Sequence, residues 1–244
     1  MRAALACLAQ SVEVSFRGFR REAIQFLADL AANNERSWFQ PRKADYERLL
    51  KEPMEQLCLA LAERFDARGI PLDADPKRSP FRIYRDTRFS RDKSPYKTHV
   101  AASFPWIAPD GGAAEGAEER AHGNGGYFNF QPGEMYLGGG MWMPARERLE
   151  AFRNAVRDDP DRVRAALHDP GFVAWFGDTH THESLKRVPP GYPPDHPMAD
   201  LFRWKDIIFG RRMSDREVLS PALPDTIADG YAAAMPVFRF LATL

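Results

Sequence analysis

The chain has 244 residues, and 44% of them are hydrophobic, so it can bury a substantial core. Its 34 basic and 34 acidic residues cancel, which argues against a general attraction to nucleic acid or to an anionic membrane. Two cysteines are too few for a disulfide framework and no apolar run is long enough to cross a bilayer, so we expect a reduced, cytoplasmic protein without a membrane partner.

The first third of the chain is predicted to be helical. Residues 1–14 carry one arginine and a short apolar stretch, and we interpret them as an N-terminal extension. Apolar residues at helical spacing then predict a helix over residues 21–32, which the asparagine pair at 33 and 34 ends. A second helix is expected over residues 41–50. A third begins near Pro53 and stops at Gly69.

The middle of the chain is predicted to form strands. The segments "FRIYR" (residues 81–85) and "THVAASF" (residues 98–104) are rich in β-branched and aromatic residues. Residues 108–124 contain many glycines, alanines and acidic residues but no large apolar side chain, which predicts a mobile surface loop.

The segment "GYFNFQPGEMYLGGGMWMP" predicts a β-hairpin, because two alternating runs flank Pro132 and Gly133. With that turn, one face carries the core residues Phe128, Phe130, Met135 and Leu137. The opposite face carries Tyr127, Asn129, Tyr136, Gly138, Gly140 and Trp142. Glycines inside a strand indicate close approach to the backbone, so this face is either the floor of a pocket, a bulge, or a surface against which a helix packs.

The last part of the chain returns to helices. They are expected from Pro144, over residues 160–168 and over residues 170–176, followed by a proline-rich extended passage. A strand over residues 206–212 and a closing helix over residues 219–242 complete the pattern. We therefore expect one α+β domain over residues 15–244, in which N-terminal and C-terminal helices pack against a mainly antiparallel sheet with a central hairpin.

Several kinds of site are absent from the sequence. It contains no Walker loop, no dinucleotide fingerprint, no paired-cysteine metal motif and no nucleophile elbow. His180 and His182 lie two residues apart beside Asp178 and Glu183, but this short group lacks a rigid third ligand. We therefore predict no metal site, and no cofactor can be assigned.

The most unusual segment is "SPFRIYRDTRFSRDKSPYKTH", residues 79–99. Six basic residues and two aspartates give it a formal charge of +4. A strand over residues 81–85 would divide its arginines between two faces. In one interpretation Asp86 and Asp92 pair with arginines and only stabilise the loop. In the other, some of the cations bind a phosphate or carboxylate beside Tyr96 and the glycine-rich hairpin face.

Four segments, taken in order, resemble the domain of unknown function 2461 family. They are "NNERSWF", the basic segment, the hairpin, and "LKRVPPGYPPDHP", and the resemblance spans roughly residues 16–241. It implies an intracellular single-domain α+β protein and brings no reaction or cofactor. The family's strongest motif residues fall on Arg82, Arg85, Asp86, Arg88, Phe89, Asp92, Lys93, Pro95, Tyr96 and Lys97, and on Gly138, Gly139 and Gly140.

Our first functional hypothesis is a protein that binds, or also processes, a small anionic molecule, with phosphate as the anion that we favour. The candidate ligand-binding residues are Arg82, Arg85, Arg88, Lys93, Tyr96, Lys97, Gly138, Gly139, Gly140 and Trp142, with Asp86 and Asp92 as structural partners. The alternatives are a module for single-stranded nucleic acid and a non-catalytic interaction scaffold. The partners of the arginines, and whether a helix covers the glycine face, discriminate among them. The sequence gives no oligomeric state.

Overall fold

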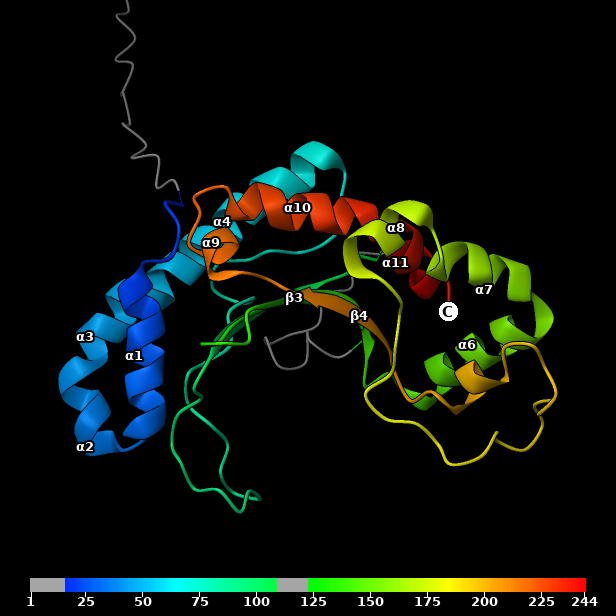
Figure 1. The fold of residues 1–244 in the computed structure, drawn as a ribbon, viewed down its shortest axis with the longest axis horizontal. Coiled ribbons are helices and arrows are strands. Elements are labelled where there is room, and N and C mark those ends of the chain that lie inside the picture. Colours follow the sequence, from blue (N-terminus) through cyan, green and yellow to red (C-terminus); the bar gives the residue numbers. More distant parts are fainter. Residues whose placement is uncertain (1–15, 109–122) are drawn as a thin grey trace, which may run out of the picture.

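The computed structural model describes residues 16–108 and 123–244. The expected N-terminal extension and nearly all of the expected loop over residues 108–124 lie outside this range. Four antiparallel strands form one sheet in the order β1 (Val100–Pro105), β2 (Gly123–Phe130), β3 (Tyr136–Trp142) and β4 (Ile207–Arg212). The sheet and the helices around it confirm the α+β class (Figure 1).

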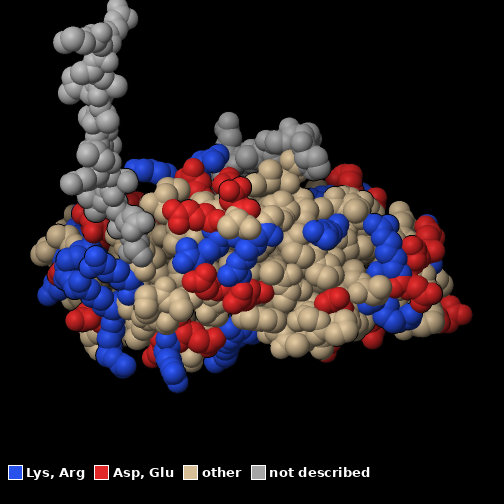
Figure 2. Space-filling view, turned by 90° about the horizontal axis from the view of Figure 1, so that it is seen from above, with Lys and Arg blue, Asp and Glu red and all other residues tan. Residues whose placement is uncertain are grey.

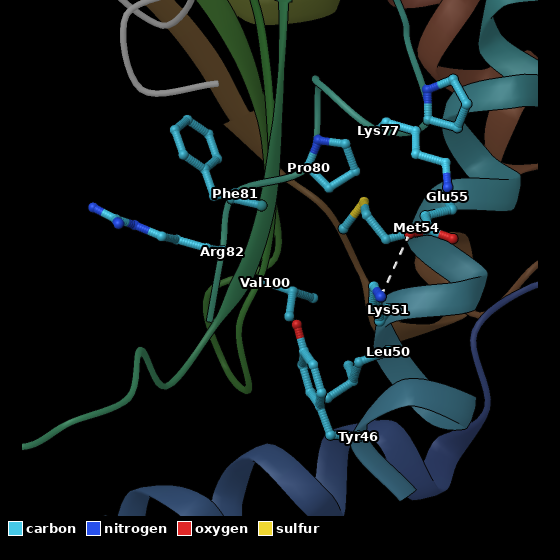
Figure 3. Close-up of a pocket in the computed structure, with 12 residues that line it drawn as sticks. Tyr46, Leu50, Lys51, Met54, Glu55, Lys77, Pro80, Phe81, Arg82 and Val100 are labelled. Carbon is cyan, nitrogen blue, oxygen red and sulfur yellow. Dashed lines mark ion pairs between the residues drawn. The ribbon is translucent and has the colours of Figure 1, made fainter. Parts of the chain in front are cut away.

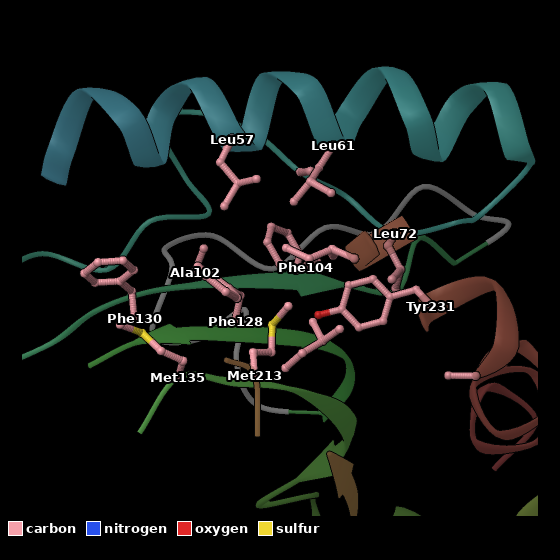
Figure 4. Close-up of a cluster of buried hydrophobic side chains, with 14 of the residues drawn as sticks. Leu57, Leu61, Leu72, Ala102, Phe104, Phe128, Phe130, Met135, Met213 and Tyr231 are labelled. Atoms are coloured by element: carbon pink, nitrogen blue, oxygen red, sulfur yellow. The ribbon is translucent and has the colours of Figure 1, made fainter. Parts of the chain in front are cut away.

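Helices cover one face of the sheet. Figure 1 shows α4 (Glu52–Arg68), α8 (Pro170–Phe176), α10 (Leu223–Ala233) and α11 (Met235–Ala242) on the same side of the strands. The hairpin register pairs Phe128 with Leu137, so the predicted core face is confirmed. Phe128, Phe130, Leu137 and Met135 are all buried, and α4 contributes Leu57 and Leu61 to the same core (Figure 4).

The N-terminal helices follow the predicted order with one difference. Helix α1 spans Arg21–Ala32 as predicted, and Gly69 ends α4 in the left-handed conformation at φ 61°. After a short break at residues 33–35, the chain is helical again from Arg36, with no second break before Pro53. It stays helical through α2 (Arg36–Phe39), a 3₁₀ turn η1 (Gln40–Arg42), α3 (Lys43–Tyr46) and a π-helical turn η2 (Glu47–Lys51). Pro53 has no N–H to donate to the preceding turn, which favours this wider turn over a regular one.

The C-terminal part contains α6 (Arg146–Asp158), α7 (Pro160–Leu167), the 3₁₀ turn η3 (Ala199–Arg203) and α9 (Asp215–Val218). Helices α7 and α8 each begin with a proline after an aspartate whose carboxylate accepts a backbone N–H. The predicted closing helix is divided into α10 and α11 at Ala234, because Pro236 lies in the first turn of α11.

The predicted strand over residues 81–85 is wrong. This segment makes only isolated pairings, Pro80 with Ala102 and Tyr84 with Tyr96. Its backbone runs beside the edge of β1 at Phe81, whose N–H donates to the Ala101 carbonyl, and then leaves the sheet. Pro80 precedes the segment and Pro95 lies opposite Arg85, and neither proline has the N–H that a continuous ladder needs.

Charges of both signs mix on the helical side of the molecule. In Figure 2, which views that side, basic and acidic side chains lie next to each other across the middle and the right of the molecule, and basic side chains gather at its left end. Arg64 and Arg68 of α4, for example, pair with Asp225 and Asp229 of α10. Among the described residues, no helix combines the length and the apolar character required to cross a membrane.

Candidate functional site

The basic segment forms an extended arm at one end of the sheet. We call residues 79–99 the basic arm; in Figure 1 it lies between α4 and β1 and reaches away from the sheet on the side opposite α10. Its two ends are tied to the fold. Near the first end, the Ser103 N–H donates to the Ser79 carbonyl at 3.0 Å. Near the other, the Asn34 side chain accepts from the Tyr96 N–H at 3.1 Å and donates to the Tyr96 carbonyl at 2.9 Å.

Asn34 holds the basic arm in place, a role that the sequence alone did not reveal. It lies in "NNERSWF", the first of the four family-like segments, and its amide acts on Tyr96 as a neighbouring strand would. Its position in a family-like segment was the one feature of the sequence that could have pointed to this role. The two hydrogen bonds thus join the "NNERSWF" segment to the basic arm, although Asn34 and Tyr96 lie 62 residues apart in the sequence.

Each aspartate of the arm engages one arginine. Arg88 binds Asp86 through Nε to Oδ1 at 3.0 Å and Nη2 to Oδ2 at 2.7 Å, and Arg85 pairs with Asp92. These contacts lower the pKa of Asp86 to about 2, chiefly through the Arg88 hydrogen bond, and Ser94 and Arg85 lower the pKa of Asp92 further. Both carboxylates are thus structural partners and poor proton acceptors near neutral pH.

The remaining cations of the arm lie at its surface. Arg82, Arg91 and Lys93 are exposed, and Lys93 donates to the Thr87 carbonyl at 2.8 Å. Phe89, at the tip, is 95% exposed, with the Arg88 guanidinium 5.9 Å from the centre of its ring. The tip is therefore convex, whereas small-molecule sites are concave.

Tyr96 belongs to the core and not to the surface of the arm. Its side chain is 1% exposed and stacks on Phe39 with ring centres 4.1 Å apart. Gln40 lies 3.5 Å from its hydroxyl. Tyr96 therefore anchors the arm to the N-terminal helices, and we exclude it from the side chains that face a ligand there.

Lys97 brings the arm to the hairpin. Its ammonium group lies 5.1 Å from the centre of the Phe81 ring, and Phe81 contacts Tyr127 with ring centres 6.3 Å apart. Tyr127 is on the sheet face opposite the helices, with its hydroxyl 3.4 Å from Asn129 Oδ1. Phe81, with Lys97 next to it, thus contacts this face of the hairpin, and ligand binding there stays a prediction.

The side chains of His99 and Tyr127, near Lys97, are neutral at neutral pH. Burial, with a smaller contribution from Lys97, lowers the pKa of the half-buried His99. Burial raises the pKa of Tyr127 to about 12. The junction therefore combines an ammonium group with a neutral imidazole and a neutral phenol, both of which can donate a hydrogen bond.

The three glycines of β3 each have a packing reason. The Tyr136 ring covers Gly138 and Gly210, and its hydroxyl donates to the Phe209 carbonyl at 3.3 Å. Gly139 faces the helices, where Phe238 leaves no room for a Cβ. Gly140 has φ +116°, and a Cβ there would lie 2.2 Å from the Ile207 carbonyl oxygen. Contacts with Tyr136, with the β4 backbone and with Phe238 thus account for these glycines, and their predicted contact with a ligand stays a prediction.

The far end of the same face carries Trp142 and the histidine segment. Trp142 contacts His182 with ring centres 5.3 Å apart, and the backbone of His182 is held by the buried Asp206 at 2.7 Å. Within the described part of the chain, no group of three or more histidines, cysteines, aspartates or glutamates is arranged to hold a metal ion.

A cavity of about 220 Å³ lies on the other side of the base of the arm, against α3, η2 and α4. Figure 3 shows it between the helices, which contribute Tyr46, Lys51 and Met54, and the segment that carries Pro80 and Val100. Arg82 and Phe81 belong to its wall, but in Figure 3 their side chains extend away from it. None of the helical residues around it was identified from the sequence.

Comparisons with known proteins place this fold within one family. No curated protein and no solved structure matches the chain. A family model does match it, over residues 22–240, which include the basic arm, the hairpin and the cavity. The chain therefore belongs to the conserved hypothetical protein family DUF2461.

Proposed function

We propose that this protein binds a small anionic molecule at the base of the basic arm, on the sheet face opposite the helices. The observation that carries the proposal is the junction of Lys97, Phe81 and Tyr127, where an ammonium group, an aromatic surface and a phenol meet. A phosphate or carboxylate fits the ammonium group and the hydroxyl, while the rings accept an apolar or planar body.

The charge of the arm supports an anionic partner. Six basic residues against two aspartates leave a formal excess of +4 on a chain whose overall charge is zero. Because the aspartates engage Arg85 and Arg88, they also hold those guanidinium groups in fixed positions at the surface. Guanidinium forks suit phosphate oxygens, so a phosphorylated molecule is the ligand class that we favour.

We assign binding and no reaction. The acidic groups of the arm have lowered pKa values, and the Tyr127 hydroxyl has a raised one, so neither suits proton transfer at neutral pH. His99 is the group whose neutral imidazole can accept a proton, and it supports a processing role only if a ligand is found beside it.

A second candidate function is binding of single-stranded nucleic acid along the arm. The exposed Phe89 ring flanked by Arg88 and Arg91 provides a stacking surface with cations next to it. Outside the arm the sequence offers only "LKRV" and "FGRRMS" as further basic segments, which is why we place this function second.

Thermal unfolding in the presence of ligands tests the proposal. Inorganic phosphate, small phosphorylated metabolites and short oligonucleotides are compared at low and moderate salt, because a ligand of the folded state raises the melting temperature. We expect stabilisation by phosphorylated metabolites, and a loss of about tenfold or more in affinity for Lys97→Met.

Two controls separate the candidates. Arg164→Ala removes an arginine that pairs with Asp161 on α7, far from the arm in the sequence, and should leave binding unchanged. Phe89→Ala should weaken oligonucleotides and spare a small ligand at the junction. If neither class stabilises the protein, or if Lys97→Met binds as tightly as the parent, the proposal is wrong and a scaffold role is favoured.

A further inference from the structure

The cavity behind the arm has an unusual wall. It is lined on the helical side by the last residue of α3, by Leu50 and Lys51 of the π-helical turn, and by Met54 and Glu55 of α4. π-Helical turns are rare and occur frequently at functional sites, because the extra residue pushes side chains out of the regular helical pattern. Here the turn directs two consecutive residues to one cavity.

A hydroxyl group without a protein partner in the described chain opens onto the cavity. Tyr46 is 8% exposed, and its ring packs on Phe39 and Phe26 with ring centres 5.5 and 6.5 Å apart. Its hydroxyl forms no hydrogen bond with any residue in the described ranges, and Figure 3 shows it directed towards Val100. Burial raises the pKa of this phenol, so it is a neutral donor. Because no side chain of the described chain accepts from it, this donor is available to a ligand in the cavity.

Two lysines and one glutamate surround the opening. Lys51 Nζ lies 4.0 Å from Glu55 Oε1, the limit of an ion pair, and its side chain is 52% exposed. Lys77 is exposed on the opposite wall, and its ammonium group pairs with no carboxylate of the described chain. The remaining wall is mostly apolar and is formed by Leu50, Met54 and Val100 with two prolines; the Arg82 side chain, also part of the wall, extends away from the cavity in Figure 3.

We propose that this cavity is a second ligand site, for a small carboxylate with a short apolar body. The apolar wall takes the body, Tyr46 donates a hydrogen bond to the head, and Lys51 and Lys77 attract its charge at the opening. The volume of about 220 Å³ equals about seven water molecules at ~30 Å³ each, which limits the ligand to a single ring or a short chain. This site does not depend on the proposed function at Lys97.

Methionine methyl NMR tests the proposal directly. Met54 lines the cavity, whereas Met135, Met141 and Met213 are buried elsewhere in the core. Benzoate and hexanoate at millimolar concentration should shift the Met54 methyl signal, which Met54→Leu assigns, and leave those three signals in place. Benzyl alcohol has the same ring without the charge and should bind at least fivefold more weakly.

Three variants locate the groups that bind. Tyr46→Phe should weaken benzoate about fivefold and leave the melting temperature unchanged or higher, because the hydroxyl has no protein partner to lose. Lys51→Met should weaken it by a similar factor. Lys43→Met is the matched control, because Lys43 is 54% exposed and pairs with Glu47 in the same i,i+4 geometry, but lies outside the cavity.

Three outcomes would overturn the inference. No shift of the Met54 methyl signal would show that the cavity does not admit these ligands. Equal binding of benzyl alcohol, or equal loss in Lys43→Met and Lys51→Met, would contradict recognition of the carboxylate. A clear fall in the melting temperature of Tyr46→Phe would show that the hydroxyl has a structural partner in solution.

Discussion

The glycine run of β3 and the basic arm are the two most unusual segments of this sequence, and the fold uses them differently. Gly138, Gly139 and Gly140 are enclosed, and each has a neighbour that occupies the place of a side chain. The arm satisfies only part of its charge internally and keeps several cations and Phe89 at the surface. An unusual motif can thus serve packing alone. Exposed charges and an exposed aromatic ring, by contrast, are typical of surfaces that contact a partner.

Two tyrosines explain why the glycines are needed. On the helical side, the fully buried Tyr231 hydroxyl lies 3.2 Å from the carbonyl oxygens of both Tyr127 and Gly138, in space that Gly126 leaves open. On the other side, the Tyr136 ring covers Gly138 and Gly210. The centre of the sheet is therefore enclosed between two aromatic side chains, and its glycines are sites where stability is most sensitive to change.

The largest effect is expected for Gly140→Ala. The substitution combines a positive φ of +116° with a Cβ 2.2 Å from a backbone oxygen, and should lower the free energy of unfolding by about 2–5 kcal/mol. Gly133→Ala is the matched control, since its φ is +76° but nothing lies near its Cβ; it should cost about 1–2 kcal/mol. Urea unfolding measures both. Equal losses would show that the close contact at Gly140 does not matter.

A smaller effect is expected for Tyr231→Phe. Removing the hydroxyl takes away the one O–H that the carbonyl groups of Tyr127 and Gly138 share, which should cost about 1–3 kcal/mol. Tyr136→Phe removes a longer hydrogen bond from a half-buried ring and should cost less. Urea unfolding compares the two variants. A greater loss of unfolding free energy for Tyr136→Phe would mean that the Tyr136 hydrogen bond stabilises the sheet more than the Tyr231 hydroxyl does.

Asn34→Ala tests how firmly the arm is attached. Loss of both hydrogen bonds to the Tyr96 backbone should cost about 1–2 kcal/mol and accelerate tryptic cleavage within residues 79–99. Asn33→Ala is its neighbour in sequence and removes one exposed hydrogen bond to Asp29, so it should leave the cleavage rate unchanged. Equal cleavage in both variants would mean that Tyr96 is held by its ring alone.

His99 should give a weak dependence of stability on pH. Its pKa in the folded protein lies below the ordinary value of about 6.5, so the unfolded chain takes up a proton first as the pH falls. Its contribution is therefore complete above pH ~6.5 and is lost as the pH falls towards the folded value. Melting temperatures of the parent and of His99→Gln over this range check it, and identical slopes would contradict it.

The smallest effect on stability is expected at the tip of the arm. The Arg88 and Asp86 side chains are exposed, so Arg88→Ala should leave the melting temperature unchanged within error. An effect on anion binding without an effect on folding would sharpen the contrast with the glycines. A marked fall in the melting temperature would instead show that the arm, like the glycines, has a structural role.

Local sequence patterns were sufficient for most individual elements. The alternation around Pro132 and Gly133 predicted the hairpin faces, because strand side chains must alternate and a tight turn sets the register. Helix α8 and the end of α4 followed from Pro170, Gly177 and Gly69, because proline favours the first turn of a helix and glycine favours its C-terminal end. The resemblance to the DUF2461 family, carried by four segments, was also visible in the sequence and is confirmed.

Tertiary contacts decided the rest. Residues 81–85 have the composition of a strand, yet their N–H and C=O groups meet β1 only at one point before the chain turns outward. Whether Tyr96 faces a ligand or the core depends on Phe39, 57 residues earlier, and on the clamp from Asn34. The cavity at Tyr46 arises where helical and extended segments meet. By itself the sequence determined the local backbone conformation and the formal charge of most segments, because both follow from the residues within the segment. Which side chains end in a core, a junction or a cavity depends on partners distant in the chain, and only the folded structure brings them together.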